Sequence, residues 1–190
     1  MAEIIQKAKE EFLRMIDDFG SDPYHVSVHV PEVEKWAKHL FLKYPEADQE
    51  IILLSVWFHD IGHYPVSKEI DHAIRSEERA RKFLEKENYP NDKIKKVLHC
   101  VRAHRCRDII PETLEAKIIA LVDSASHMTS TMYLDIARNH KGRDSNYSLY
   151  DKMKRDIRDL TAFPEIKDEL KELYEAWEKL IKAYNKINLK

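Results

Sequence analysis

A histidine and an aspartate stand side by side at the end of an apolar run. Residues 51–58 read Ile-Ile-Leu-Leu-Ser-Val-Trp-Phe, and His59 and Asp60 follow directly. An unpaired carboxylate at the buried end of a helix is costly. A bound divalent cation removes this cost, because imidazole and carboxylate are both good ligands for Zn, Mn or Fe. The pair therefore predicts a metal site.

Two more groups of this kind could join the pair. His29 stands near the start of an earlier expected helix, and Asp123 follows the apolar residues 118–122. Helical bundles build metal sites from side chains that several helices direct inward. We therefore expect all four groups to meet at one ion. Plainer interpretations exist for each part: Asp123 as a helix residue capped by a neighbouring serine, and His59 as a histidine at a helix C-terminus beside its partner acid.

The elements that must position these groups are predicted to be helices. Glycine is scarce, at 3 residues, and Glu, Lys, Leu, Ile and Ala dominate, a composition that favours helices over tight hairpins. The segment at 47–59 is apolar along most of its length and should lie at the centre of the fold. A glycine turn at 141–145 is expected to separate the C-terminal third. The expected helices cover about 3–19, 29–43, 47–59, 69–87, 92–104, a long helix that starts at 111–113 and leads into Asp123, and 164–187.

Composition excludes several classes of protein. The net charge is −2 over 190 residues, so no basic field predicts binding of a long nucleic acid. No apolar run approaches the length of a membrane span, and the N-terminus lacks the apolar region of a signal peptide. We therefore expect a cytoplasmic protein. Cys100 and Cys106 form neither a CxxC pair nor a disulfide framework.

The order of the four candidate ligands resembles the HD-domain superfamily of metal-dependent phosphohydrolases. Residues 59–62 match the HDIG form of its signature, and 22–33 are similar to the opening motif of predicted HD hydrolases. Residues 71–84, 94–104 and 115–123 resemble the later helices of that family. The likeness covers roughly 23–136. It implies an all-α bundle with the metal site between core helices.

The resemblance also implies a domain organisation and a ligand set. The chain would be a single HD domain, 1–190, with a core at about 23–136. Residues 145–190 would be a C-terminal helical extension that packs on the core or at a dimer interface. Two departures, Val26 in place of an acid and Glu32 in place of a frequent arginine, predict different substrate contacts near the second helix. The implied metal ligands are His29, His59, Asp60 and Asp123.

Other side chains are candidates for the substrate side of the site. His25 lies four residues before His29, so the two share a face if the helix starts early; it could be a supporting or substrate-binding group or a surface histidine. His63 stands where family members often place a group that meets phosphate, and with Asp60 it is our catalytic candidate. Arg105 suits phosphate, although a solvated helix end explains it equally well.

The interval between the HD pair and the last aspartate holds two further histidines of interest. Some HD proteins use histidines in this interval to hold a second metal, and His72 and His104 are placed to do so, with His99 as a competitor for His104. Their alternative role is to hydrogen-bond the phosphate or a water. For the remaining histidines a surface or core position is the default, although one of them, His127, lies one helical turn beyond Asp123. These are His39, His127 and His140.

The predicted function is hydrolysis of a phosphoester of a nucleotide or a similar small phosphorylated metabolite, through a metal-activated water. Two alternatives stay open: a di-iron HD-type oxygenase and a non-catalytic, ligand-sensing HD module. The expected cofactor is one divalent metal ion, or two, chosen from Mn, Fe, Co, Ni, Zn and Mg. The expected partner is the small phosphorylated substrate, without a membrane or a long nucleic acid, and a homodimer is an option.

Overall fold

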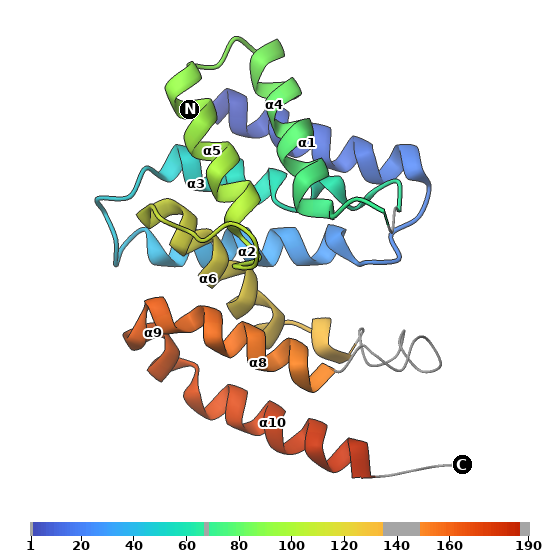
Figure 1. Cartoon of the computed structure of the whole chain (residues 1–190), viewed down its shortest axis with the longest axis vertical. Helices are drawn as coiled ribbons and strands as arrows, with labels where there is room; N and C mark the ends of the chain where they lie inside the picture. The colour runs from blue at the N-terminus through green and yellow to red at the C-terminus, as the bar shows by residue number, and fades with distance from the viewer. Residues whose placement is uncertain (1, 67–68, 135–148, 187–190) are drawn as a thin grey trace.

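A computed structural model describes residues 2–66, 69–134 and 149–186, and in these ranges it contains helices and no strand (Figure 1). The predicted all-α fold class is confirmed. None of the helices in these ranges combines the length and apolar character that crossing a bilayer requires. The turn expected at 141–145 lies outside the described residues. The elements are α1 Ala2–Phe19, α2 Val26–Leu40, α3 Gln49–Phe58, η1 Ile61–His63, α4 His72–Lys86, α5 Asn91–Ala103, α6 Leu114–Thr129, α8 Leu149–Asp159, η2 Leu160–Ala162, α9 Pro164–Glu169 and α10 Lys171–Lys186.

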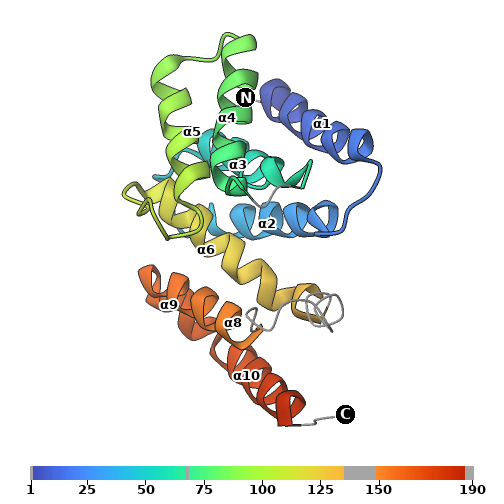
Figure 2. The ribbon, with the colours of Figure 1, turned by 45° about the vertical axis from the view of Figure 1, so that its right-hand side comes forward.

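Helix α3 lies at the centre of the fold, as its apolar sequence predicts (Figures 1 and 2). It contacts α1, α2, α4, α5 and α6. The Asp48 carboxylate caps its first turn by accepting from the backbone N–H groups of Glu50 and Ile51. Trp57 is buried and meets Phe12 of α1 edge to face at 5.5 Å between ring centroids. The helix therefore carries His59, its C-terminal cap, into the middle of the molecule.

Helix α2 begins three residues earlier than expected. Its first turn is organised by Asp22, whose carboxylate accepts from the N–H groups of Val26 at 3.0 Å and Ser27 at 2.9 Å. His25, at the N-terminal cap, adopts the left-handed backbone conformation with φ of 55°. Because the cap lies at His25, His29 stands one turn inside the helix, where its side chain is buried.

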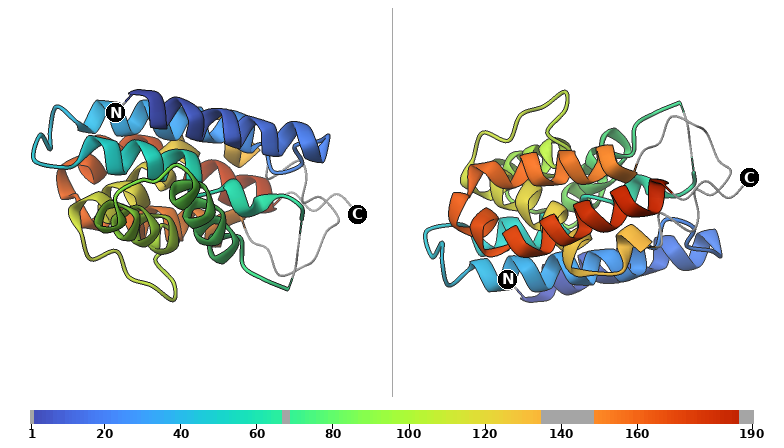
Figure 3. Two further views of the ribbon diagram at one scale, coloured as in Figure 1. Left: turned by 90° about the horizontal axis from the view of Figure 1, so that it is seen from above. Right: turned by 90° about the horizontal axis from the view of Figure 1, so that it is seen from below.

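The C-terminal helices pack on one side of α6 (Figures 2 and 3). Helix α8 contacts both α6 and α10, and Trp177 of α10 donates its indole N–H to the Met128 carbonyl at 2.9 Å. The prediction of a single helix at 164–187 is wrong, because the segment forms two helices, α9 and α10. They are separated at the buried Leu170, which has φ of −87° and ψ of 0°. The extension thus contacts the core of its own chain, and the homodimer stays a prediction.

The short helix η1 is held against α4 at a glycine. The Gly62 N–H donates to the Ser76 hydroxyl at 2.8 Å. A Cβ at residue 62 would lie 2.5 Å from the Ser76 backbone nitrogen and closer still to the His72 carbonyl oxygen. Only a residue without a side chain therefore allows this approach, which sets Asp60 and His72 beside each other.

We expect Gly62→Ala to destabilise the protein by about 1–3 kcal/mol, because backbone atoms of α4 must move to make room for the methyl group. The thermal midpoint should fall by roughly 5 °C in a calorimetric scan. Gly20→Ala is the matched control, since no atom lies within 4 Å of its added methyl and only the strain of φ 75° remains. If Gly20→Ala lowered the thermal midpoint as much as Gly62→Ala or more, this account of residue 62 would be contradicted.

Candidate metal centre

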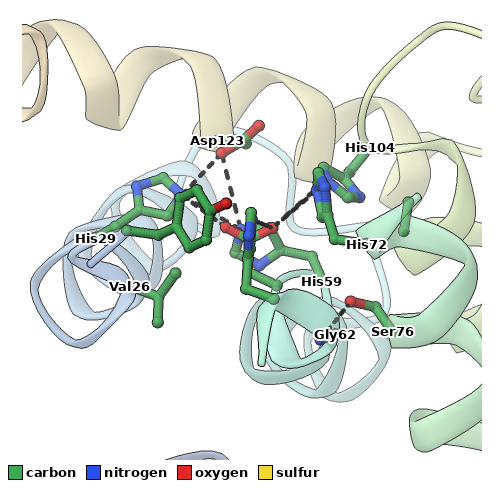
Figure 4. A network of polar contacts seen from close by, with 12 residues as sticks. Val26, His29, His59, Gly62, His72, Ser76, His104 and Asp123 are labelled. Carbon is green, nitrogen blue, oxygen red and sulfur yellow. Dashed lines mark hydrogen bonds and ion pairs between the residues drawn. The ribbon is translucent and has the colours of Figure 1, made fainter. Parts of the chain in front are cut away.

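The four predicted ligands come together between α2, the end of α3 and α6, and Figure 4 labels three of them, His29, His59 and Asp123. His29 Nε2 lies 2.9 Å from Asp123 Oδ1 and 3.3 Å from His59 Nε2. Asp60 Oδ2 lies 3.7 Å from His29 Nε2 and 3.6 Å from His59 Nε2. His29 and His59 are buried, and Asp123 is largely so. Three of these groups, His29, His59 and Asp123, offer ligand atoms within 4.8 Å of one another.

The second oxygen of Asp60 faces a different set of histidines. Oδ1 lies 3.3 Å from His72 Nε2, 3.4 Å from His63 Nε2 and 3.7 Å from His104 Nε2. His72 Nε2 and His104 Nε2 lie 3.4 Å apart. Asp60 therefore stands between two groups of ring nitrogens, with one carboxylate oxygen toward each. On the Oδ1 side, Asp60, His63 and His72 offer ligand atoms within 4.8 Å of one another, and His104 lies next to His72.

Backbone carbonyls determine which ring nitrogen of two histidines carries the proton. His59 Nδ1 lies 2.7 Å from the Val56 carbonyl oxygen, and His104 Nδ1 lies 2.7 Å from that of Val101. A carbonyl only accepts, so each Nδ1 must donate its N–H. In the neutral ring Nε2 then keeps its lone pair, and in both residues Nε2 faces Asp60. Metal-binding histidines are oriented by contacts of this type.

His29 Nε2 points at Asp123. It lies 2.9 Å from Asp123 Oδ1, and without a metal the ring donates a hydrogen bond to that carboxylate. On the other side of the ring, Nδ1 lies 3.2 Å from the Ser126 hydroxyl, which donates to the Asp123 carbonyl oxygen at 2.7 Å. His29 Nε2 and His59 Nε2 lie 3.3 Å apart, with Asp123 Oδ1 beside both. The donor set fits a divalent metal ion.

Burial and neighbouring charge give these groups the protonation states that ligands need. Burial alone would raise the pKa of Asp60 and of Asp123, but the surrounding histidines hold both carboxyl pKa values well below their usual range. Burial lowers the pKa of His29, and burial together with His59 lowers that of His104 to about 3. The carboxylates are therefore charged and these imidazoles neutral near pH 7.

The low pKa of His104 predicts how the metal-free protein responds to acid. Below pH 6.5 the unfolded chain takes up a proton on this residue, whereas the folded protein does not until about pH 3. The free energy of unfolding should therefore be unaffected by this group above pH 6.5 and should fall as the pH drops from 6.5 towards 3. Urea unfolding of metal-free protein at pH 7, 5.5 and 4.5 measures how steeply the free energy of unfolding changes with pH.

His104→Gln should make this slope shallower, because the group that titrates differently in the two states is gone. His39→Gln is the control, since His39 lies at the surface with its side chain 49% exposed. A slope that is the same in wild type and in the His104 variant would contradict the assignment of a buried, neutral His104.

The remaining predicted side chains separate into those at the site and those away from it. A cavity of about 400 Å³ opens above Asp60, and His63, His72, His104 and Arg105 all line it. His63 stacks on His72 with ring centroids 4.1 Å apart. Arg105 is held by an ion pair with the Asp71 carboxylate.

Two of the sequence candidates lie elsewhere. His25 is not among the described residues that line the cavity, although Tyr24 and Val26 on either side of it are. The left-handed backbone at His25 is the physical reason, because it takes the residue out of helical register with His29. His99 accepts from the Glu112 N–H at 3.1 Å on the other side of α5, so His104 is the histidine of this helix that faces the site.

Sequence reasoning missed a polar network behind Asp123. We expected His127 at the surface or in the core by default; it is buried, stacks on His29 at 4.7 Å and places Nε2 3.6 Å from Asp123 Oδ1. Lys152 of α8 donates to His127 Nδ1 at 3.0 Å and to Asp156 Oδ1 at 2.7 Å. The spacing of four residues from Asp123 was a usable signal for His127. No signal pointed to α8.

These features define a class: an all-α protein with a buried cluster of histidines and aspartates fit for divalent metal. A family model for the HD domain matches residues 26–128, more than half of the chain. The chain belongs to the HD domain family, most of whose members are metal-dependent phosphohydrolases. Searches of curated proteins and of solved structures gave no significant match. The matched segment runs from the start of α2 nearly to the end of α6, and α8 lies outside it.

Proposed function

We propose that the protein is a two-metal phosphohydrolase that acts on a phosphoester of a nucleotide or a similar small phosphorylated metabolite. The observation that carries the proposal is the position of Asp60, whose two oxygens face separate sets of ring nitrogens. Pairs of ions bridged in this manner clamp the attacking and leaving oxygens of a displacement at phosphorus. HD domain membership supports the reaction class.

The ligand assignment follows from the geometry of the nitrogens. One ion would be held by His29, His59, Asp60 Oδ2 and Asp123. The other would be held by Asp60 Oδ1, His72 and His104. His63 is the competing third ligand, because Asp60, His63 and His72 also offer ligand atoms within 4.8 Å of one another. We assign His104 instead because its Nδ1 donates to the Val101 carbonyl, the contact that orients metal-binding histidines.

The side chains around the ions have separate tasks. Bound divalent cations would lower the pKa of a water molecule and polarise a phosphoryl oxygen. Asp60, with one oxygen toward each set of histidines, would hold both ions and so fix the groups that they bind. His63 lies at the cavity wall, 3.4 Å from Asp60 Oδ1, where a proton on Nε2 can be given to the leaving oxygen. Arg105, fixed by Asp71, adds positive charge to the cavity that the phosphate enters.

A panel of phosphoesters tests this proposal. Metal-stripped protein is reloaded separately with Mn, Fe, Co, Ni, Zn or Mg and assayed for phosphate release on ribonucleotides, deoxynucleotides and sugar phosphates. We expect turnover with at least one metal, restricted to a few substrates. No phosphate release from any ester with any of these metals would contradict the proposal.

A second candidate function is oxidative, and a specific observation favours keeping it. The six groups brought together are, in chain order, His, His-Asp, His, His and Asp, the order that a di-iron HD-type oxygenase would use. Anaerobic loading with Fe(II), followed by measurement of oxygen uptake, separates the two functions. Phosphate release without oxygen consumption supports the hydrolase. A third candidate, the ligand-sensing module, would show nucleotide-induced thermal stabilisation without product.

A further inference from the structure

The cavity above the metal centre extends well beyond the proposed ligands. Its volume of about 400 Å³ lies in the range of small-molecule sites, roughly 300–1,000 Å³. One wall is formed by side chains of α8 and of the connection between α5 and α6. Four cationic side chains line it, two from each of these segments. They are Arg105, Arg107, Lys152 and Arg155.

Two of these four cations already have carboxylate partners. Arg105 pairs with Asp71, and Lys152 Nζ lies 2.7 Å from Asp156 Oδ1. Two acids in the same wall also have partners: Asp156 accepts from the Tyr133 hydroxyl at 2.8 Å, and Asp159 pairs with Arg158 at 3.0 Å. Burial nevertheless raises the pKa of Asp159 to about 6.

Arg107 and Arg155 are the other two cationic side chains of this wall. Within the part of the chain that the structure describes, neither has a carboxylate within ion-pair distance. Arg155 is half-buried in the cavity wall, where an unpartnered guanidinium loses solvation without compensation. Arg107 is exposed at the rim. Two of the four cationic groups that line the cavity thus have no carboxylate partner among the described residues.

From these two guanidinium groups without an ion-pair partner we infer that the cavity binds a substrate with a second phosphate group, which Arg155 and Arg107 hold while the first phosphate lies at the metal centre. The inference rests on the proposed function. A guanidinium group binds two phosphate oxygens through two parallel hydrogen bonds. Two guanidinium groups together match the double charge of a phosphate better than they match the single charge of a carboxylate. Arg155 belongs to α8, beyond the matched family segment, so this preference is a property of the C-terminal extension.

Calorimetric titration of Mn-loaded protein tests the inference without relying on turnover. The ligands are AMP, ADP, which has an adjacent second phosphate, and adenosine 3′,5′-bisphosphate, which has a remote one. We expect at least one of the two bisphosphorylated compounds to bind roughly tenfold more tightly than AMP. Arg155→Ala should abolish this difference, and Arg107→Ala should reduce it.

Lys154→Ala is the matched control. It removes one positive charge from the adjacent position of α8, where the ammonium lies over the Tyr150 ring at 4.2 Å and does not line the cavity. The preference should survive in this variant. Equal affinity for all three nucleotides in wild type, no binding of any of them, or a preference that Arg155→Ala leaves intact would each overturn the inference.

Phosphate release measured in the same samples keeps this inference distinct from the proposed function. Turnover of AMP or of p-nitrophenyl phosphate without any preference for a second phosphate leaves the hydrolase intact and removes the inference. An Arg155-dependent preference without any phosphate release has the opposite meaning: the subsite exists, and the hydrolase assignment fails.

Discussion

Asp60→Ala is expected to lose both metal ions and to lower phosphoester turnover by more than about 10³-fold. The reason is that, among the residues the structure describes, Asp60 is the carboxylate that faces both sets of ring nitrogens, with Oδ2 toward His29 and His59 and Oδ1 toward His72 and His104. Loss of a residue that only supports a ligand costs roughly 10–100-fold, and a shared ligand should cost more. Metal content per chain by mass spectrometry and phosphate release give the two readouts.

Two further variants make this result interpretable. Asp60→Asn keeps the shape but removes a buried charge, so it should fold at least as well as wild type in the absence of metal while still failing to hold two ions. Asp18→Ala removes an exposed carboxylate, 66% accessible, and should change neither readout. An Asp60→Ala protein with full metal content and full activity would show that the site has been assigned to the wrong residues.

His104→Ala is expected to reduce the metal content from two ions per chain to one and to lower turnover by roughly 10²-fold. His104 presents a lone pair to the Oδ1 side of Asp60 only, because its Nδ1 donates to the Val101 carbonyl. The ion held by His29, His59 and Asp123 should remain. Metal analysis after gel filtration, paired with a phosphate-release assay, measures the effect.

His63→Ala provides the contrast for this second prediction. His63 also lies near Asp60 Oδ1, but it is more exposed and stacks between Tyr24, at 4.7 Å, and His72, at 4.1 Å. We expect its variant to keep both ions and to lose turnover, with the largest loss on substrates that have poor leaving groups. If the His63 variant lost one ion and the His104 variant lost none, His63 would be the metal ligand and the assignment of His104 as a ligand would be wrong.

The buried parts of the fold and site could be predicted from local sequence. Residues 51–58 are apolar apart from Ser55, so α3 was expected at the centre, where the histidine and the carboxylate at its end need polar partners. Asp123 follows an apolar stretch of its own, residues 118–122, which is why its inward direction could be anticipated. His29 lies in a helix of mixed composition, and the resemblance to the HD family indicated its role. The structure brings these side chains together; their role as ligands remains a proposal.

Features that depend on distant contacts could not be predicted in this way. The start of α2 is determined by the Asp22 side chain, which reaches Val26 and Ser27 from outside the helix. Lys152 and Asp156 look like ordinary members of a solvated helix, because their spacing of four residues suits a surface ion pair. Only the packing of α8 on α6 turns them toward His127.

The central claim, that Asp60 lies between two metal ions, is tested most directly by anomalous diffraction from crystals grown with Mn²⁺. The account predicts two anomalous peaks. One should contact Asp60 Oδ2 with His29, His59 and Asp123, and the other should contact Oδ1 with His72 and His104. A single peak at only one oxygen of Asp60, or manganese bound elsewhere while this cluster stays empty, would contradict it.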